Sequence, residues 1–315
     1  MNDLISVIMS TYNENRSELF DSINSILNQS YKNLEFIIVL DKPDNFEIKK
    51  ILDEFKINDS RIKVIFNKKN LGLAESLNEG IYTAKGTFLA RMDADDIAFP
   101  DRIEKQLNYI KNYDFDMIST NRIDIDESGK EISNKSSLPK NSEIHKLLPV
   151  GNFINHPTVF IKKEVIKKVG GYRNFKSAQD YDLWLRLLSS GYKIGILDEP
   201  LLYYRIRNQG ISQSDKYRQF LFTQYQQKLF YERMEGKEDS FSEENLELFL
   251  NKNRYNDPVY KEKFNTVNQK LEKGLLLLKR KEYRKSFALL LQSMLLNKHV
   301  AKKFFSIMKY KIYSS

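Results

Sequence analysis

Four short apolar runs, separated by helical patterns, constrain the fold of this chain more than any other feature. The runs are Leu4–Ser10, Leu34–Leu40, Ile62–Phe66 and Thr87–Met92, and residues 17–28, 46–55 and 73–84 between them have helical spacing. Largely apolar runs are typical of strands buried on both faces, and strand–helix–strand repetition favours a parallel sheet covered by helices. We therefore expect an α/β fold that binds its ligands at the carboxyl ends of the strands.

After Phe115 the pattern changes. We predict a hairpin over 115–133, a strand over Asn155–Lys162, a short helix ending at Gly170-Gly171, a strong helix over Ala178–Ser190 and a last strand over Leu201–Arg207. Beyond it the chain is helical over 216–234, 243–251, 259–279, 283–296 and 300–311, with a helical hairpin around Leu275–Leu278 and Leu289–Leu291. We place the domain boundary near residue 212, with an α/β domain over 1–212 and a helical domain over 213–315.

Polar residues follow each of the first strands. Thr11-Tyr12-Asn13 follows the first strand, Asp41 the second, Asn67–Asn70 the third and the run Asp93-Ala94-Asp95-Asp96 the fourth. The carboxyl ends of parallel strands share one edge of the sheet, so these groups are expected to lie together.

The acidic run is a candidate metal site. Asp93 and Asp95, two positions apart after a buried strand, can turn toward one hard cation such as Mn²⁺ or Mg²⁺. A polar loop or a helix cap is the alternative, since a helix begins shortly after Pro100. The strand context and the other strand-end groups favour the metal site.

Two other aspartates have a possible chemical role. A carboxylate at Asp41 could accept the imide N–H of a uracil or thymine ring, although an ordinary turn before Pro43 is an equal alternative. Asp180 and Asp182, in Gln179-Asp180-Tyr181-Asp182-Leu183-Trp184, are candidates for a general base that takes the proton of an incoming hydroxyl. A capping role at the helix N-terminus suits Asp182 better than Asp180.

Several site classes are excluded by what the sequence lacks. There is no cysteine, which excludes disulfides, thiolate nucleophiles and Cys-ligated metals and suggests a reducing compartment. The histidines His145, His156 and His299 lack metal-ligand spacing, and no GxGxxG or GxxxxGK[ST] loop occurs. We therefore expect neither a histidine zinc site nor P-loop or dinucleotide chemistry.

The ordered motifs resemble one known family. The chain is similar to family 2 inverting glycosyltransferases with the GT-A fold, which build bacterial capsules, O-antigens and exopolysaccharides. The resemblance covers about residues 3–212 and is carried by residues 5–13, 25–30 with 34–39, 70–78, 91–96, His156-Pro157-Thr158, Gly170-Gly171-Tyr172 and 179–186. It implies a GT-A domain with a mixed, mostly parallel sheet, followed by an all-helical extension.

The resemblance also implies roles for individual residues. Thr11, Tyr12, Asn13 and Asp41 would hold the nucleoside of a UDP-sugar, while Asn70, the 73–78 segment with Asn78, and Ala94 would line the donor pocket. Asp95 would be the main metal ligand and Asp93 would lie near the ribose and sugar. Asp180 would be the catalytic base and His156 would approach the donor sugar or the acceptor.

Two positions depart from the family pattern. Gln179 stands where many relatives have Glu, so the base has a neutral neighbour. Arg207 follows Tyr204-Arg205-Ile206 where many relatives have His. Arginine cannot ligate a cation, so we expect Arg207 to replace a metal-side contact in part by neutralising the diphosphate directly.

The net charge of +9 is concentrated at the end of the chain. Residues 251–315 hold 16 Lys and Arg against 4 Asp and Glu, whereas residues 1–250 hold 35 against 38. Residues 270–315 interleave basic with bulky apolar side chains, and 298–311 is predicted to be an interfacial helix on an anionic membrane. A solvated basic helix packed on the preceding hairpin is the alternative.

These features predict a cytoplasmic enzyme on the inner face of the cell membrane. No apolar run of about 18 residues and no basic-then-apolar leader occurs, so we expect no membrane span and no secretion by that route. The expected acceptor is a saccharide linked to polyprenyl diphosphate. We do not expect nucleic acid as a ligand, because only the tail is basic, whereas the body is slightly acidic and lacks a nucleic-acid motif.

Other functions remain open at this stage. The chain could be an inactive sugar-nucleotide-binding scaffold, or a metal-dependent phosphodiesterase or pyrophosphatase that uses the Asp93 cluster. The transferred sugar, the choice among UDP, dTDP and GDP, and assembly into a homo-oligomer are not determined by the sequence.

Overall fold

The computed structural model describes residues 3–134, 138–207 and 215–313. By their contacts the residues fall into two compact units, Met1–Ile144 with Phe153–Asn208 and His145–Asn152 with Gln209–Ser315, called here the first and second units. The segment His145–Asn152, which the sequence analysis assigned to the domain over 1–212, belongs to the second unit.

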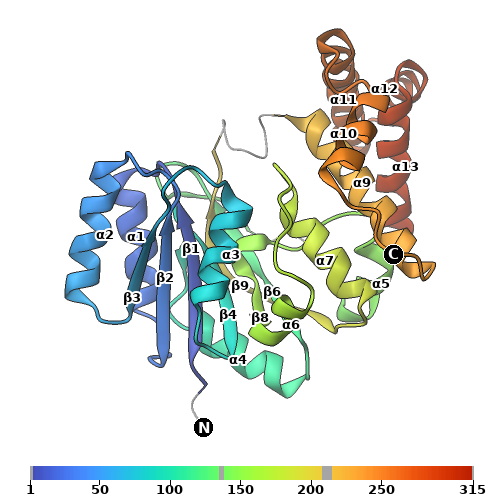
Figure 1. Ribbon diagram of the computed structural model, residues 1–315. Coiled ribbons are helices and arrows are strands. Elements are labelled where there is room, and N and C mark those ends of the chain that lie inside the picture. Colours follow the sequence, from blue (N-terminus) through green and yellow to red (C-terminus); the bar gives the residue numbers. More distant parts are fainter. Residues whose placement is uncertain (1–2, 135–137, 208–214, 314–315) are drawn as a thin grey trace. The chain divides into compact units, whose positions relative to one another are not determined.

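The first unit is built on one mixed sheet (Figure 1). Within the described part of the chain its strands run in the order β3-β2-β1-β4-β8-β6-β9-β5, and β7 pairs with β6. The strands are β1 Ile5–Thr11, β2 Leu34–Leu40, β3 Ile62–Phe66, β4 Phe88–Asp93, β5 Ile97–Ala98, β6 Met117–Ile125, β7 Glu131–Asn134, β8 Phe160–Lys162 and β9 Ile194–Arg205. The pairs among β1 to β4 are parallel, whereas β8 runs antiparallel to both β4 and β6.

Helices flank the sheet and connect its strands. In the first unit they are α1 Arg16–Leu27, α2 Phe46–Asn58, α3 Leu73–Thr83, α4 Arg102–Asn112, α6 Lys163–Lys168 and α7 Gln179–Ser189, with the 3₁₀ turns η1 Asn141–Glu143 and η2 His156–Thr158. The short helix α5, Ile144–Leu147, spans the division between the units. The expected α/β class and mixed, mostly parallel sheet are confirmed.

The two faces of the central strands pack against different helices. Val7 and Met9 of β1 belong to a buried apolar cluster with residues of α1, α2 and α4. Ile8 faces the other way and packs closely on α3, where a Cβ at Gly80 would lie 2.6 Å from Ile8 Cγ2. Alternating side chains of one strand therefore stabilise both layers, as expected for a covered parallel sheet.

Three strand predictions need correction. The strand Ile62–Phe66 is at the edge of the sheet and ends in an exposed Phe66, so it is not buried on both faces. The predicted strand Asn155–Lys162 is a strand only over β8, because Pro157 lies in the 3₁₀ turn η2. The last strand starts earlier than predicted, at Ile194, and passes Pro200 through a shift in its pairing with β6.

The second unit contains the remaining helices. They are α9 Lys216–Met234, α10 Glu243–Lys252, α11 Pro258–Lys279, α12 Tyr283–Leu296 and α13 Lys298–Tyr313. Its core includes Tyr217 of α9, Phe264 and Leu271 of α11, Leu290 of α12 and Val300 of α13. The predicted helical hairpin is confirmed, since Ser286 Oγ of α12 donates to the Gly274 carbonyl of α11 at 2.9 Å.

No helix in the described ranges combines the length and the apolar character that a membrane span requires.

Candidate functional site

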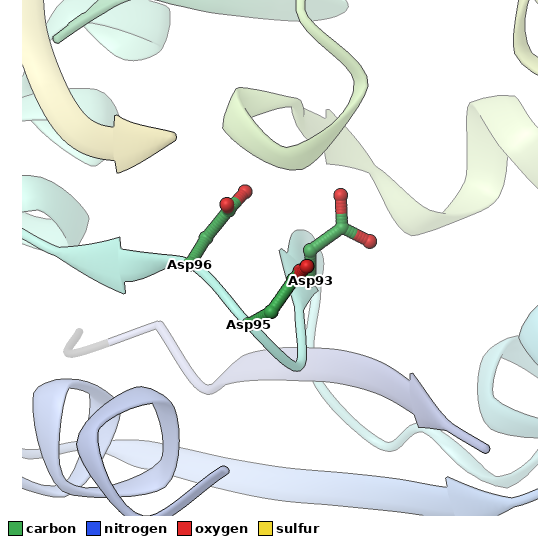
Figure 2. Close-up of side chains that lie close together, drawn as sticks. All are labelled: Asp93, Asp95 and Asp96. Atoms are coloured by element: carbon green, nitrogen blue, oxygen red, sulfur yellow. The ribbon is translucent and has the colours of Figure 1, made fainter. Parts of the chain in front are cut away.

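The acidic run lies in the turn between β4 and β5. Asp93 is the last residue of β4. The buried Ala94 follows it, and Asp95 and Asp96 complete the turn before β5 begins at Ile97. One carboxylate oxygen from each of Asp93, Asp95 and Asp96 lies within 4.8 Å of the other two. Figure 2 shows the three side chains leaving this one turn. The structure thus brings together the carboxylates that the sequence analysis proposed for a cation.

Asp96 is the most deeply buried of the three. Its Oδ1 accepts a hydrogen bond from the Arg205 backbone N–H at 2.9 Å, and within the described residues its buried Oδ2 has no hydrogen-bond partner. Burial raises the pKa of Asp96 well above the ordinary range, and the charges of Asp93 and Asp95 raise it further. A buried oxygen without a partner, next to two more carboxylates, fits a hard divalent cation that would supply the missing interaction.

Two buried arginines, which the sequence analysis did not identify, lie at the base of the cluster. Arg91 of β4 pairs with Asp93. Arg102, the first residue of α4, donates from Nη2 to the Arg91 carbonyl at 2.7 Å and to the Pro157 carbonyl at 2.8 Å. Burial lowers the pKa of Arg102 to about 9 despite the nearby carboxylates of Asp96 and Asp93. An arginine inside the apolar run 88–92 is the sequence signal that could have revealed this charge pairing.

The end of β9 supplies further contacts. Arg207 donates from Nε to Asp95 Oδ2 at 3.0 Å and from Nη2 to Glu18 Oε2 at 2.7 Å. Glu18 of α1, also not identified from the sequence, is largely buried. Arg207 therefore lies on the expected metal ligand itself, while its predicted contact with the diphosphate stays a prediction.

Tyr204 lies beside the same cluster. Its ring stacks on the guanidinium of Arg122, whose Cζ is 3.7 Å from the ring centroid. Burial and the carboxylates of Asp93 and Asp96 raise the pKa of Tyr204 to about 12, so its hydroxyl stays protonated at neutral pH. The hydroxyl can therefore donate a hydrogen bond on this side of the cluster.

Asp41 organises the loop that precedes α3. Its buried carboxylate accepts from Asn67 Nδ2 at 2.7 Å and from the backbone N–H groups of Leu71 and Gly72, each at 2.8 Å. Asn70 caps the same turn by accepting from the Gly72 N–H at 3.0 Å. Asp41 thus holds the loop that carries Asn70. Its expected contact with a uracil or thymine ring stays a prediction.

The Thr11–Asn13 segment is tied to its neighbours through Glu14. The Glu14 carboxylate accepts from Thr11 Oγ1 and, at 2.8 Å, from the Tyr12 N–H. Asn13 Oδ1 accepts from Lys42 Nζ at 3.0 Å. Burial raises the pKa of Glu14, since the hydrogen bonds from Thr11 and Tyr12 only partly offset the loss of hydration. The exposed ring of Tyr12 is left facing solvent beside this network.

Asp180 and the acidic cluster act on the same buried hydroxyl. Tyr172 Oη lies 2.8 Å from His156 Nε2. Burial raises the pKa of Tyr172, and among its charged neighbours Arg91 lowers it while Asp180 and Asp93 raise it. Because both carboxylates influence one phenol, the structure brings the predicted base, His156 and Asp93 into one region.

Asp182, the other candidate for the general base, is paired with an arginine. Asp182 is fully buried, and its Oδ2 accepts from Arg186 Nε at 2.8 Å. Asp182 therefore has a structural role, as its place in the helix suggested, whereas Asp180 is only half-buried in the first turn of α7. His156 is partly buried, and its loss of hydration together with Arg91 lowers its pKa well below the ordinary range, so it is neutral at physiological pH.

Asn78 faces the protein backbone. Its Nδ2 donates to the Tyr172 carbonyl and its Oδ1 accepts from the Tyr172 N–H, both at 2.8 Å. This geometry gives Asn78 a positioning role for Tyr172, while the expectation that Asn78 lines the donor pocket stays a prediction.

Comparison with known proteins identifies the family. Residues 6–170 match the model of glycosyl transferase family 2. The chain belongs to this family. An uncharacterized glycosyltransferase of Methanocaldococcus jannaschii is 39% identical over 224 residues, which is 70% of this chain and 77% of that protein.

Two bacterial relatives have assigned pathways. The O-antigen biosynthesis glycosyltransferase WbnJ of Escherichia coli is 39% identical over 67% of this chain and 83% of its own length. The amylovoran biosynthesis glycosyltransferase AmsE of Erwinia amylovora is 32% identical over 64% of this chain and 76% of its own length.

Solved structures share the fold. The crystal structure of residues 1–349 of S. aureus TarS matches with a TM-score of 0.60 at 17% identity, covering 98% of this chain and 90% of that one. A second TarS structure, in complex with UDP-GlcNAc, matches with a TM-score of 0.57 at 18% identity, covering 78% of this chain and 70% of that one. The expected GT-A fold is confirmed.

Proposed function

We propose that this family 2 glycosyltransferase moves a sugar from a UDP-sugar to a hydroxyl of a saccharide acceptor, with inversion at the anomeric carbon. The observation that carries the proposal is the cluster of Asp93, Asp95 and Asp96 at the end of β4, where one carboxylate oxygen from each lies within 4.8 Å of the others. The half-buried Asp180 in the first turn of α7, whose charge acts together with that of Asp93 on Tyr172, supports its role as the base. A UDP donor is also supported by TarS, which was crystallised with UDP-GlcNAc.

In the proposed reaction, Asp180 takes the proton of the acceptor hydroxyl. The acceptor oxygen forms a bond to the anomeric carbon while the bond from that carbon to the diphosphate oxygen breaks, and the electron pair leaves with UDP. The two bonds lie on opposite faces of the sugar, which inverts the configuration. Neutral His156 and the protonated hydroxyl of Tyr172 orient groups at this end of the site without adding charge.

Asp95 and Asp93 would hold a divalent cation, Mn²⁺ or Mg²⁺, with the orphaned Asp96 oxygen beside them. When bound, such a cation supplies positive charge to a nucleoside diphosphate leaving group. The guanidinium of Arg207 binds Asp95, one of these two ligands. Its positive charge would supply part of the neutralisation that the metal ion would otherwise provide.

The proposed setting is the synthesis of a bacterial surface polysaccharide on the cytoplasmic side of the membrane. WbnJ and AmsE act in O-antigen and amylovoran biosynthesis, which supports a saccharide acceptor. An acceptor carried on polyprenyl diphosphate would agree with the basic surplus of residues 251–315, because such an acceptor is presented at a membrane.

A substitution of the base tests the proposal. Asp180→Asn is expected to lower the rate of acceptor-dependent UDP release by about 10²–10⁴, because the hydroxyl loses its proton acceptor. UDP binding, measured by calorimetry with Mn²⁺, should stay near the wild-type value. The exposed Asp21→Asn is the matched control and should leave the rate unchanged.

The same assay separates the competing functions. Transfer predicts a glycoside product of inverted configuration by NMR, with UDP released in equal amount. Release of a sugar phosphate would instead indicate a pyrophosphatase, and UDP-sugar binding without turnover would indicate a scaffold.

A further inference from the structure

A row of large apolar side chains lies exposed along α12. Tyr283, Phe287, Leu291 and Leu295 follow one another at intervals of four residues and are 62%, 68%, 42% and 79% exposed. Residues four apart lie on the same side of a helix, so the four form one continuous face, called here the α12 face. Contiguous exposed apolar surface of this kind marks an interaction site more often than scattered single residues do.

The α12 face is not a part of the core that happens to be open. The opposite side of α12, with Ser286, Leu290 and Ser293, is already buried. Leu290 packs against α11 so closely that a Cβ at Gly274 would lie 2.9 Å from Leu290 Cδ2. Because α12 has a complete packing face on α11, the exposed row is additional apolar surface.

The neighbouring helix α13 behaves differently. Val300 of α13 belongs to the core of the second unit, and Phe304 and Ile307 pack against it. Part of the apolar side of α13 is therefore used inside the unit, while Phe305 and Ile312 of the same helix are 63% and 66% exposed. The expectation that the helix over 298–311 meets a membrane stays a prediction, and α12 carries the exposed row of four apolar residues.

The charges around the α12 face indicate what it meets. The turn before α12 and its first residues contain Lys279, Arg280, Lys281, Arg284 and Lys285, with Glu282 as the acidic residue among them. Arg280, Arg284 and Lys285 are exposed, and Arg284 lies on the same side of the helix as the apolar row. A second copy would bring an equally basic surface against this one, which like charges oppose, whereas an anionic surface is attracted.

We propose that the α12 face docks on an anionic lipid bilayer. The side chains of Phe287, Leu291 and Leu295 enter the boundary between headgroups and acyl chains, and Tyr283 lies at the level of the headgroups. Arg280 and Arg284 then contact lipid phosphates. This inference rests on the proposed function only for its purpose, which is to hold the enzyme where a lipid-linked acceptor is presented.

Co-sedimentation with lipid vesicles tests the α12 face on the full chain. Wild-type protein is expected to bind vesicles of phosphatidylglycerol and phosphatidylcholine and to bind vesicles of phosphatidylcholine alone much more weakly. Phe287→Ser with Leu291→Ser and Leu295→Ser should weaken binding to the anionic vesicles by about tenfold or more, since the inserted apolar area is lost. The double substitution Arg280→Gln with Arg284→Gln should also weaken vesicle binding. The loss should be larger at low salt than at high salt, because salt screens the attraction between the arginines and the lipid phosphates.

The matched control removes exposed apolar side chains from another helix. Phe46→Ser with Ile57→Ser on α2 changes side chains that are at least as exposed, and vesicle binding should stay at the wild-type level. Thermal unfolding of each variant checks that the fold is retained. Because the α12 residues are exposed, their replacement should leave the melting temperature almost unchanged.

Two results would overturn the inference. One is equal binding of the triple variant and the wild type to anionic vesicles. The other is a wild-type dimer in sedimentation velocity that the triple variant breaks, with no vesicle binding by either, which would make the α12 face a self-association surface. UDP release with a soluble acceptor, measured without vesicles, is expected to be the same for the triple variant and the wild type, so failure of transfer and failure of docking are distinguished.

Discussion

At the scale of single residues, the site is a balance of buried charges. Asp93 has Arg91 as its partner, Asp95 has Arg207, and Asp96 accepts from the Arg205 backbone. Each aspartate of one short turn therefore has a different environment, although the three are adjacent in the sequence. Asp96 is buried whereas Asp95 is partly exposed, and the role of Asp95 as the main metal ligand stays a prediction.

Removal of Arg207 tests this balance. Arg207→Ala takes away the cation that binds Asp95 Oδ2, so Mn²⁺ in the presence of UDP should bind several-fold more tightly by calorimetry, in line with about 1 kcal/mol for a partly exposed pair. The KM for the UDP-sugar should rise if Arg207 also contacts the diphosphate.

Arg61→Ala is the control for Arg207→Ala. It breaks a similar ion pair with Asp59, at 2.7 Å, away from the acidic cluster, and should change neither Mn²⁺ binding nor KM. If Arg207→Ala also leaves Mn²⁺ affinity, KM and kcat at their wild-type values, Arg207 has no part in the site.

At the scale of elements, helices and turns place the side chains of the candidate site. Asn15 and Glu18 form a capping box at the start of α1, and the same Glu18 binds Arg207. Gly171, with a φ of +67°, lets the chain pass so close to α3 that a Cβ would lie 2.6 Å from Asn78 Oδ1. This contact fixes Tyr172 between α3 and α7.

Asn78→Ala tests the contact between α3 and Tyr172. The variant leaves the N–H and the carbonyl of Tyr172 without their partner, so the free energy of unfolding should fall by about 1–3 kcal/mol in urea titrations. Transfer should also slow, because Tyr172 and His156 lose their fixed position.

Asn58→Ala provides the comparison for Asn78→Ala. Its exposed amide donates to the Glu54 carbonyl within α2, so its loss should cost well under half as much. Equal effects of the two substitutions would contradict a positioning role for Asn78.

At the scale of the whole molecule, each unit contains one histidine whose pKa is lowered by loss of hydration. In the first unit, burial and Arg91 lower the pKa of His156. In the second unit, burial, with Lys298 and Lys302, lowers the pKa of His299 to about 4. The folded state lowers the pKa of each histidine from its unfolded value of about 6.5. At any pH between these two pKa values, the histidine therefore binds fewer protons in the folded state than in the unfolded state.

The free energy of unfolding should therefore fall as the pH drops below about 6.5, because the unfolded state binds protons that the folded state does not bind. Each histidine contributes a slope of up to about 1.4 kcal/mol per pH unit until its folded pKa is reached. Thermal unfolding between neutral pH and the pKa of about 4 for His299 measures this slope.

His299→Asn is the informative variant for this pH dependence. It should flatten the slope for the second unit while leaving that of the first unit unchanged. A melting temperature that does not depend on pH in this window would show that His156 and His299 do not govern acid stability.

The sequence by itself determined the succession of strands and helices and the polar groups at the strand ends. Apolar periodicity is local, so β2, β3, α9 and α12 begin and end at the predicted residues. The same local information predicted that Asp93 and Asp95 would lie together, because they are two positions apart at the end of a strand.

Only the tertiary structure decided which partner each charged or apolar group has. Glu18 and Arg207 are 189 positions apart, and Asp95 and Arg207 are 112 apart, so no local pattern relates them. For the same reason the sequence could not tell that Val300 of α13 would enter the core while α12 would keep an exposed apolar face. Both helices have apolar periodicity, and the packing of α11 determines which side of each is buried.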